Sequence, residues 1–201
     1  DFSMPLSDSL NLAFGGEVRT EEFSIGAGQE ESYIDGGLGT QGFSTSTNGF
    51  PGFSPTIAGS WKRQNTALYA DLEYVASEQL LLAAALRFED FDDFGTTTNY
   101  RLGFNYAIND TLGVRATVSS GFKAPTPGQS NAANISTQII GGVLTNQGVI
   151  PSTSPATVLR GGAGLGPENS NNYTLGAYAT VGPFEVTIDY FDIDVEDRLS
   201  L

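Results

Sequence analysis

Alternation of apolar with small or polar residues across residues 66–129 constrains the fold of this chain more than any other feature of its sequence. The alternation runs through four successive segments, and period two indicates a β-strand with two unlike faces. In the second segment one parity carries Leu80, Leu82, Ala84, Leu86 and Phe88, and the other carries Leu81, Ala83, Ala85, Arg87 and Glu89. Each segment spans about 10 residues, the length that a tilted strand needs to cross a bilayer core.

Five charged residues of these segments fall on the less apolar parity. They are Asp71, Glu73, Arg87, Arg101 and Arg115. Charges on a lipid-facing surface are costly, so this parity is expected to face water inside a barrel. Aromatic residues are candidates for girdles at the membrane interfaces: Tyr69, Tyr74, Phe88, Tyr100, Phe104, Tyr106, Tyr173, Phe184 and Tyr190.

The connections between the predicted strands alternate in length. We predict strands at residues 10–23, 67–75, 79–90, 99–108, 111–122, 172–181 and 184–195, preceded by a turn within residues 1–9. The links at 76–78, 109–110 and 182–183 are tight, whereas 24–62, 91–98 and 123–171 are longer. Every long connection therefore lies at one end of the strands, which is typical of a transmembrane antiparallel up-and-down β-barrel with short periplasmic turns and long extracellular loops. The sequence predicts an all-β fold of this kind.

Charge and composition exclude several classes of function. The formal net charge of −14 argues against nucleic acid as a partner, because binding to phosphates depends on Lys and Arg. The chain contains neither His nor Cys, which excludes imidazole metal clusters and Ser/His or Cys/His catalytic pairs. We predict that the chain is not an enzyme, assign no catalytic residue and expect no cofactor.

Three motifs go beyond periodicity: residues 86–95 (LRFEDFDDFG), 120–126 (SGFKAPT) and 165–176 (LGPENSNNYTLG). In this order and at these spacings they resemble the C-terminal half of the barrel of TonB-dependent outer-membrane receptors. In that family a Gly-Phe-Arg-Ala-Pro element ends a strand, a long loop follows, and a Pro-Glu-x-Ser element begins the next strand. The matching positions are Gly121, Phe122, Lys123, Ala124 and Pro125, then Pro167, Glu168 and Ser170. Lys123 stands where the family usually has Arg, which keeps the charge but loses the bidentate fork.

The resemblance implies that residues 1–201 are a partial barrel domain, with about seven strands of a barrel of about 22, and that the plug and the closing strands are absent from it. It implies active uptake of a scarce nutrient, whether a siderophore, cobalamin, an oligosaccharide or a peptide, across the outer membrane of a Gram-negative bacterium. The implied partners are outer-membrane lipid and lipopolysaccharide, the small nutrient, and the TonB–ExbB–ExbD complex, reached through an N-terminal plug. A passive diffusion porin and an outer-membrane adhesin remain alternatives, and the sequence does not select the nutrient.

Three groups of residues are candidates for specific roles. Aromatic and polar residues in or beside the long loops are candidate ligand contacts, although the aromatics would also serve to pack the loop on itself: Phe43, Phe50, Phe53, Trp61, Arg63 and Gln129. The acidic corner at Asp90, Asp92 and Asp93 is a weak Ca²⁺ candidate, and solvated surface charge is its commoner explanation. Lys123 and Glu168 are expected to lie at one rim and to form an ion pair.

Overall fold

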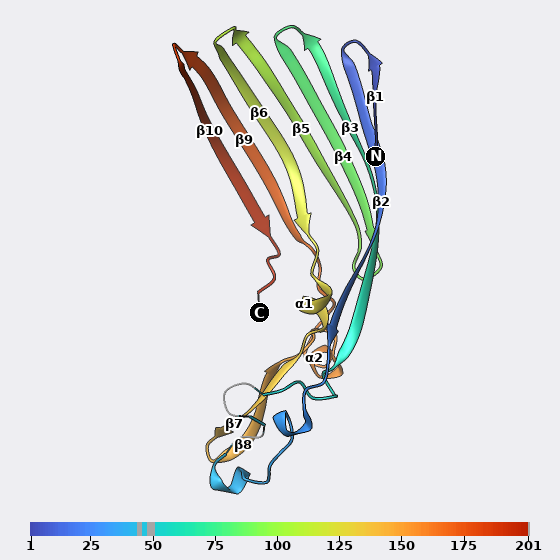
Figure 1. Cartoon of the computed structure of the whole chain (residues 1–201), viewed down its shortest axis with the longest axis vertical. Helices are drawn as coiled ribbons and strands as arrows, with labels where there is room; N and C mark the ends of the chain where they lie inside the picture. Colours follow the sequence, from blue (N-terminus) through green and yellow to red (C-terminus); the bar gives the residue numbers. More distant parts are fainter. Residues whose placement is uncertain (44–45, 48–50, 201) are drawn as a thin grey trace. The chain divides into compact units, whose positions relative to one another are not determined.

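The computed structural model describes residues 1–43, 46–47 and 51–200, and strands dominate it (Figure 1). Eight strands form one sheet in the order β1-β2-β3-β4-β5-β6-β9-β10, and a separate hairpin pairs β7 with β8. The strands are β1 Phe2–Ser7, β2 Leu10–Ile25, β3 Gly59–Ser77, β4 Leu80–Phe91, β5 Gly95–Asn109, β6 Leu112–Lys123, β7 Asn134–Ile140, β8 Val143–Val149, β9 Glu168–Val181 and β10 Phe184–Glu196. The short helices are η1 Glu30–Ser32, η2 Gly39–Gln41, α1 Pro127–Asn131 and α2 Pro155–Val158. Among the described residues, no helix has the length and apolar character needed to cross a membrane.

The chain divides into two compact units, which we call the wall unit and the loop unit. The wall unit comprises Asp1–Arg19, Gln64–Ala124 and Gly166–Ser200. The loop unit comprises Thr20–Arg63 and Pro125–Leu165, and it contains the β7–β8 hairpin and all four short helices. The long connections of the sheet therefore have structure of their own, which the sequence analysis did not predict.

Within residues 1–9 the predicted turn is present at Asp8 and Ser9, but the residues before it form a strand that was not predicted. Phe2–Ser7 forms β1 and pairs antiparallel with β2, with Phe2 opposite Phe14 and Met4 opposite Leu12. Pro5 argues against a strand in the sequence because it lacks an N–H group for the ladder. An edge strand such as β1 tolerates such a residue. The sheet consequently has eight strands where the alternation predicted seven.

The predicted longer loop at residues 91–98 is wrong. β4 continues to Phe91 and β5 begins at Gly95, so only residues 92–94 connect them. Gly95 has a φ of +95°, a conformation that favours glycine and that lets the chain reverse tightly. The polar residues Thr96 and Thr98, which made this segment look like a loop, instead continue the strand opposite Asp90 and Phe88.

One face of the sheet carries a continuous apolar band. The register places one row of apolar side chains side by side across six neighbouring strands: Tyr74, Leu82, Phe104, Ala116, Leu175 and Tyr190. Towards the end of the sheet where β4 turns into β5, the same face becomes polar at the paired residues Thr66 and Asp90. Large side chains in the band are solvent-accessible, as Leu68 at 62% and Leu102 at 51% show. An exposed apolar surface of this extent marks a membrane or interaction surface.

The opposite face is polar and is held together by contacts that cross strands. The Arg115 guanidinium on β6 reaches across β9 to Asp189 on β10, with 2.7 Å between Nη2 and Oδ2. Gly176 lies between them in register, and a Cβ there would stand 2.0 Å from Asp189 Oδ1. Tyr69 also belongs to this face, with its ring centroid 5.3 Å from Arg87 Cζ. Its predicted place in an aromatic girdle is therefore wrong.

Candidate functional site

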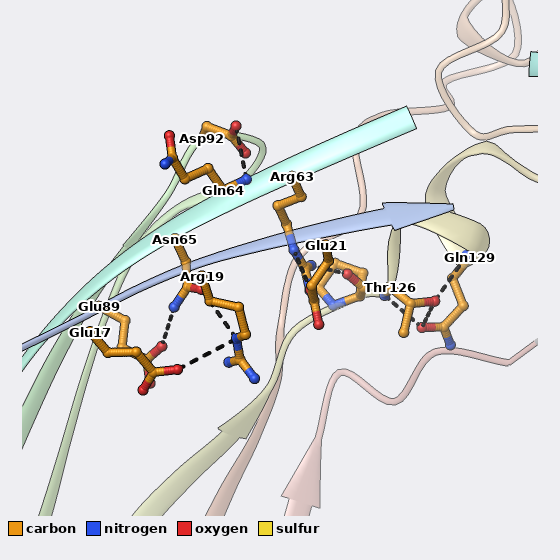
Figure 2. Close-up of polar contacts among 11 residues, drawn as sticks. Glu17, Arg19, Glu21, Arg63, Gln64, Asn65, Glu89, Asp92, Thr126 and Gln129 are labelled. Carbon is orange, nitrogen blue, oxygen red and sulfur yellow. Dashed lines mark hydrogen bonds and ion pairs between the residues drawn. The ribbon is translucent and has the colours of Figure 1, made fainter. Parts of the chain in front are cut away.

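Arg63 on β3 is a buried charged residue of the loop unit, with an exposed fraction of 5% (Figure 2). Arg63 Nε donates to Glu21 Oε2 at 3.0 Å, and Nη2 contacts the same oxygen. Nη1 donates to the backbone carbonyl of Pro125, a residue with no exposed side chain. Arg63 thus ties β2 and β3 to the segment that follows β6, and we interpret it as a positioning residue of the loop unit.

The segment after Pro125 turns into α1 through a complete capping box (Figure 2). Thr126 Oγ1 accepts from the backbone N–H of Gln129 at 3.1 Å, and Gln129 Oε1 accepts from the backbone N–H of Thr126 at 2.9 Å. Pro127 at the first helical position has no N–H group to satisfy, which suits a helix start. The structure uses the Gln129 side chain in this cap, and a ligand contact by it stays a prediction.

The loop aromatics occupy different environments. Trp61 lies on β3 rather than in a loop, and its ring stacks on Phe23 with centroids 6.0 Å apart and an interplanar angle of 24°. Phe53 is half-buried and its carbonyl accepts from the N–H of Gly28 at 2.8 Å, whereas Phe43 is 59% exposed. Phe50 lies outside the described residues. Packing within the loop, one of the two predicted explanations, therefore applies to Trp61.

The polar face of the wall unit contains a network on β2, β3 and β4. Glu89, only 4% exposed, accepts from Arg87 Nε at 2.5 Å and from Asn65 Nδ2 at 2.8 Å. Arg87 Nη2 also donates to Glu17 at 3.1 Å, and Arg19 Nε donates to Asn65 Oδ1 at 3.4 Å. Figure 2 shows part of this network. Each buried charge has an opposite charge or amide beside it, as burial requires.

The motifs at residues 120–126 and 165–176 meet on neighbouring strands of the wall unit. Register places Gly121 opposite Ser170 and Lys123 opposite Glu168 on β6 and β9. The expected ion pair forms, with 3.3 Å between Lys123 Nζ and Glu168 Oε1. The backbone N–H of Leu199 donates to the same oxygen at 3.1 Å, and this bond together with Lys123 holds the pKa of the Glu168 carboxyl below its ordinary value. Phe122 packs edge-on against Phe91, with ring centroids 5.8 Å apart.

The Lys123–Glu168 pair can be tested by exchanging its charges. Lys123→Glu places two carboxylates side by side and is expected to destabilise the sheet by about 1 kcal/mol, a modest value because the lysine side chain is 62% exposed. Adding Glu168→Lys should recover part of this loss in a urea titration. Recovery should be incomplete, because lysine cannot accept the Leu199 N–H. A double variant no more stable than Lys123→Glu alone would contradict the pairing.

The acidic corner does not gather into a metal site. Asp92 Oδ2 accepts from the backbone N–H of Gln64 at 3.1 Å, while Asp90 projects from β4 on the apolar-band face. Within residues 1–43, 46–47 and 51–200, no group of three or more acidic side chains is placed to hold a metal ion. On β4 the successive residues Glu89 and Asp90 point to opposite faces, while Asp92 and Asp93 lie in the turn that follows the strand. The arrangement gives the weak Ca²⁺ candidate no support.

Comparison with known proteins identifies the fold. The model of the family described as TonB dependent receptor-like, beta-barrel matches residues 3–201. The chain belongs to the TonB-dependent receptor β-barrel family. This family consists of receptors and transporters rather than enzymes, and its members are outer-membrane proteins of Gram-negative bacteria.

Individual TonB-dependent receptors resemble the chain to different extents. The vitamin B12 transporter BtuB of Vibrio cholerae is 42% identical over 65 residues, which cover 31% of this chain and 10% of the transporter. The ferric enterobactin receptor PfeA of Pseudomonas aeruginosa superposes with a TM-score of 0.68 at 18% identity over 96% of this chain and 25% of that receptor. The siderophore receptor PirA of Acinetobacter baumannii gives 0.67 at 15% identity over 98% and 26%. The chain thus spans about a quarter of the solved receptors, and those similarities concern the fold.

Membership of the TonB-dependent receptor family gives the two faces their meaning. The apolar band corresponds to the outward face of a transmembrane β-barrel, and it carries a hollow of about 500 Å³ lined by Leu102, Val118 and Leu175 among others. The polar face, with the Glu89 network, lines the barrel interior. The sequence analysis missed this network as a unit. The sequence contained one sign of it, because Arg87, Glu89 and Asn65 all lie at odd-numbered positions. Asn65 on β3 faces Phe91 in register, so its side chain lies on the same face as Arg87 and Glu89.

Proposed function

We propose that this chain supplies barrel wall and outer loops to a receptor that imports a scarce nutrient by TonB-dependent active transport. The observation that carries the proposal is the match of the TonB-dependent receptor barrel to residues 3–201, on a sheet whose lipid-facing band is continuous across six strands. The chain would lie in the outer membrane, with the wall unit in contact with lipid and lipopolysaccharide. The short turns that join β1 to β2, β3 to β4, β5 to β6 and β9 to β10 would face the periplasm, and the long connections would be extracellular.

Energy for transport would come from the TonB–ExbB–ExbD complex, acting through a plug that these residues do not include. The nutrient would first contact the loop unit, where the aromatic residues and Arg63 lie. The curated relative is named as a vitamin B12 transporter and the solved relatives as siderophore receptors, so the family accommodates chemically different cargo.

Uptake measurements test the proposal directly. A strain lacking the receptor should grow poorly on one member of a panel of scarce nutrients, and the intact gene should restore growth. Uptake of that labelled nutrient should fall to the background level of the deletion strain when a protonophore collapses the proton gradient, because TonB-dependent transport draws on that gradient. Uptake that persists unchanged under the protonophore would instead indicate a passive pore, and binding without uptake would indicate an adhesin.

A further inference from the structure

The loop unit contains a hollow of about 480 Å³ that the sequence motifs do not account for. Its apolar lining comes from three parts of the unit: Ile57 and Trp61 beside β3, Ile135 on β7, and Ile150 and Pro155 between β8 and α2. We call it the Trp61 pocket. A volume of several hundred Å³ with a mostly apolar lining is typical of a site for a small molecule.

The polar side chains of the Trp61 pocket already have partners within the protein. Asn131 Nδ2 donates to the carbonyl of Pro127 at 2.9 Å, the Ser154 hydroxyl lies 2.9 Å from that of Thr157, and the Thr56 hydroxyl lies 2.6 Å from that of Ser54. These bonds hold the lining in place. The pocket can therefore bind a ligand mainly through its shape and through apolar contacts. A few hydroxyl and amide groups retain some capacity for hydrogen bonds to that ligand.

The Trp61 indole is fixed before any ligand arrives. One side of it stacks on Phe23, and Phe23 in turn packs against Gly128 of α1, where a Cβ would come within 3.3 Å of the phenyl ring. Gly59 lies beside the six-membered ring of the indole, since a Cβ there would stand 2.8 Å from two of its ring atoms. A rigid aromatic surface binds a flat or ring-shaped ligand at low entropic cost.

The described residues that line the Trp61 pocket are all uncharged. The basic residues of the loop unit are Lys62, Arg63 and Arg160, and the first two pair with Glu22 and Glu21. Ser60 donates to Glu22 and Lys62 lies beside it, which lowers the pKa of that carboxyl and keeps the pair charged. The pocket thus presents no cation to an anionic ligand, and burying an unpaired anion is costly.

We propose that the Trp61 pocket binds an uncharged nutrient through an apolar ring face laid on the indole, and that a polyanionic ferric chelate is not its ligand. This inference rests on the proposed function and adds the chemical class of the cargo. Two sources share this chemistry, a neutral corrinoid and a neutral oligosaccharide, because both present carbon-bound hydrogen atoms to an aromatic ring.

The test uses the full-length receptor that carries this chain, purified in detergent and titrated calorimetrically with cyanocobalamin, maltohexaose and ferric enterobactin. One of the two neutral probes should bind. Trp61→Ala should weaken that binding about tenfold or more, as loss of a central aromatic contact commonly does, while Trp61→Phe should retain most of it. Lys62→Ala is the matched control, since its side chain is the next along β3 and 67% exposed, and it should leave the affinity unchanged.

A second variant tests the charge argument without removing the indole. Ala133 is half-buried in the lining, and Ala133→Lys places a cation in the pocket. It should weaken the neutral probe, whereas a pocket built for an anion would bind ferric enterobactin more tightly after the change. Binding of ferric enterobactin alone, binding of neither neutral probe, or neutral binding that is indifferent to Trp61→Ala and Ala133→Lys overturns the inference. Protonophore-sensitive uptake would still support the proposed function in each of those cases.

Discussion

Replacing Arg63 with alanine is expected to destabilise the loop unit by about 2–3 kcal/mol, among the largest effects available in this chain. The substitution leaves the buried Pro125 carbonyl without its donor and removes the partner of Glu21. The Glu21 side chain is 40% exposed and can rehydrate, which keeps the cost below that of a fully buried ion pair. Arg63→Lys should give an intermediate loss, because an ammonium cannot reproduce the forked contact.

Hydrogen exchange in the full-length receptor measures this effect where it occurs. The amides of Gly28 and Ala132 donate within the loop unit at 2.8 and 2.7 Å, so they report its opening. A loss of 2–3 kcal/mol corresponds to exchange that is about 30- to 150-fold faster. Lys62→Ala supplies the control, since it alters the adjacent exposed residue. Equal exchange rates in the two variants would show that Arg63 does not hold the unit together.

Arg63 also shows where sequence analysis reaches its limit. Its residue type marked it as a candidate, but its partners lie 42 and 62 positions away, and no local pattern connects them. The Trp61 pocket has the same character, since its lining comes from segments before and after residues 64–124 of the wall unit. Contacts of this kind depend on how two long loops fold together, which periodicity does not describe.

The strands of the wall unit were predictable because a membrane-spanning strand must alternate apolar and polar side chains along its length. Alternation located β3 to β6, β9 and β10, and the parity of Arg87, Arg101 and Arg115 separated the polar face from the lipid-facing one. The errors occurred where that alternation is weak. Pro5 concealed β1, and the polar residues Thr96 and Thr98 look like a loop because β5 extends beyond the apolar band.

Arginine at Ala84 should interfere with assembly of the wall, whereas arginine at Ala83 should be tolerated. Ala84 lies inside the apolar band between Leu72 and Leu102, so its substitution exposes a guanidinium to hydrocarbon. The expected cost is about 2–4 kcal/mol near the bilayer midplane. The free energy of unfolding, measured by urea titration of the receptor in vesicles, reports this difference.

Ala83 makes the comparison strict, because it is the same residue type one position earlier on the same strand. It faces the barrel interior between Glu73 and Gly103, where a guanidinium meets water and a nearby carboxylate. Arginine there should change stability by less than about 1 kcal/mol. Because a shift of one residue reverses every face of a strand, equal losses at both positions would mean that the register or the assignment of faces is wrong. A larger loss at Ala84 would locate lipid on the face that carries Leu102, and it would do so independently of any similarity to other receptors.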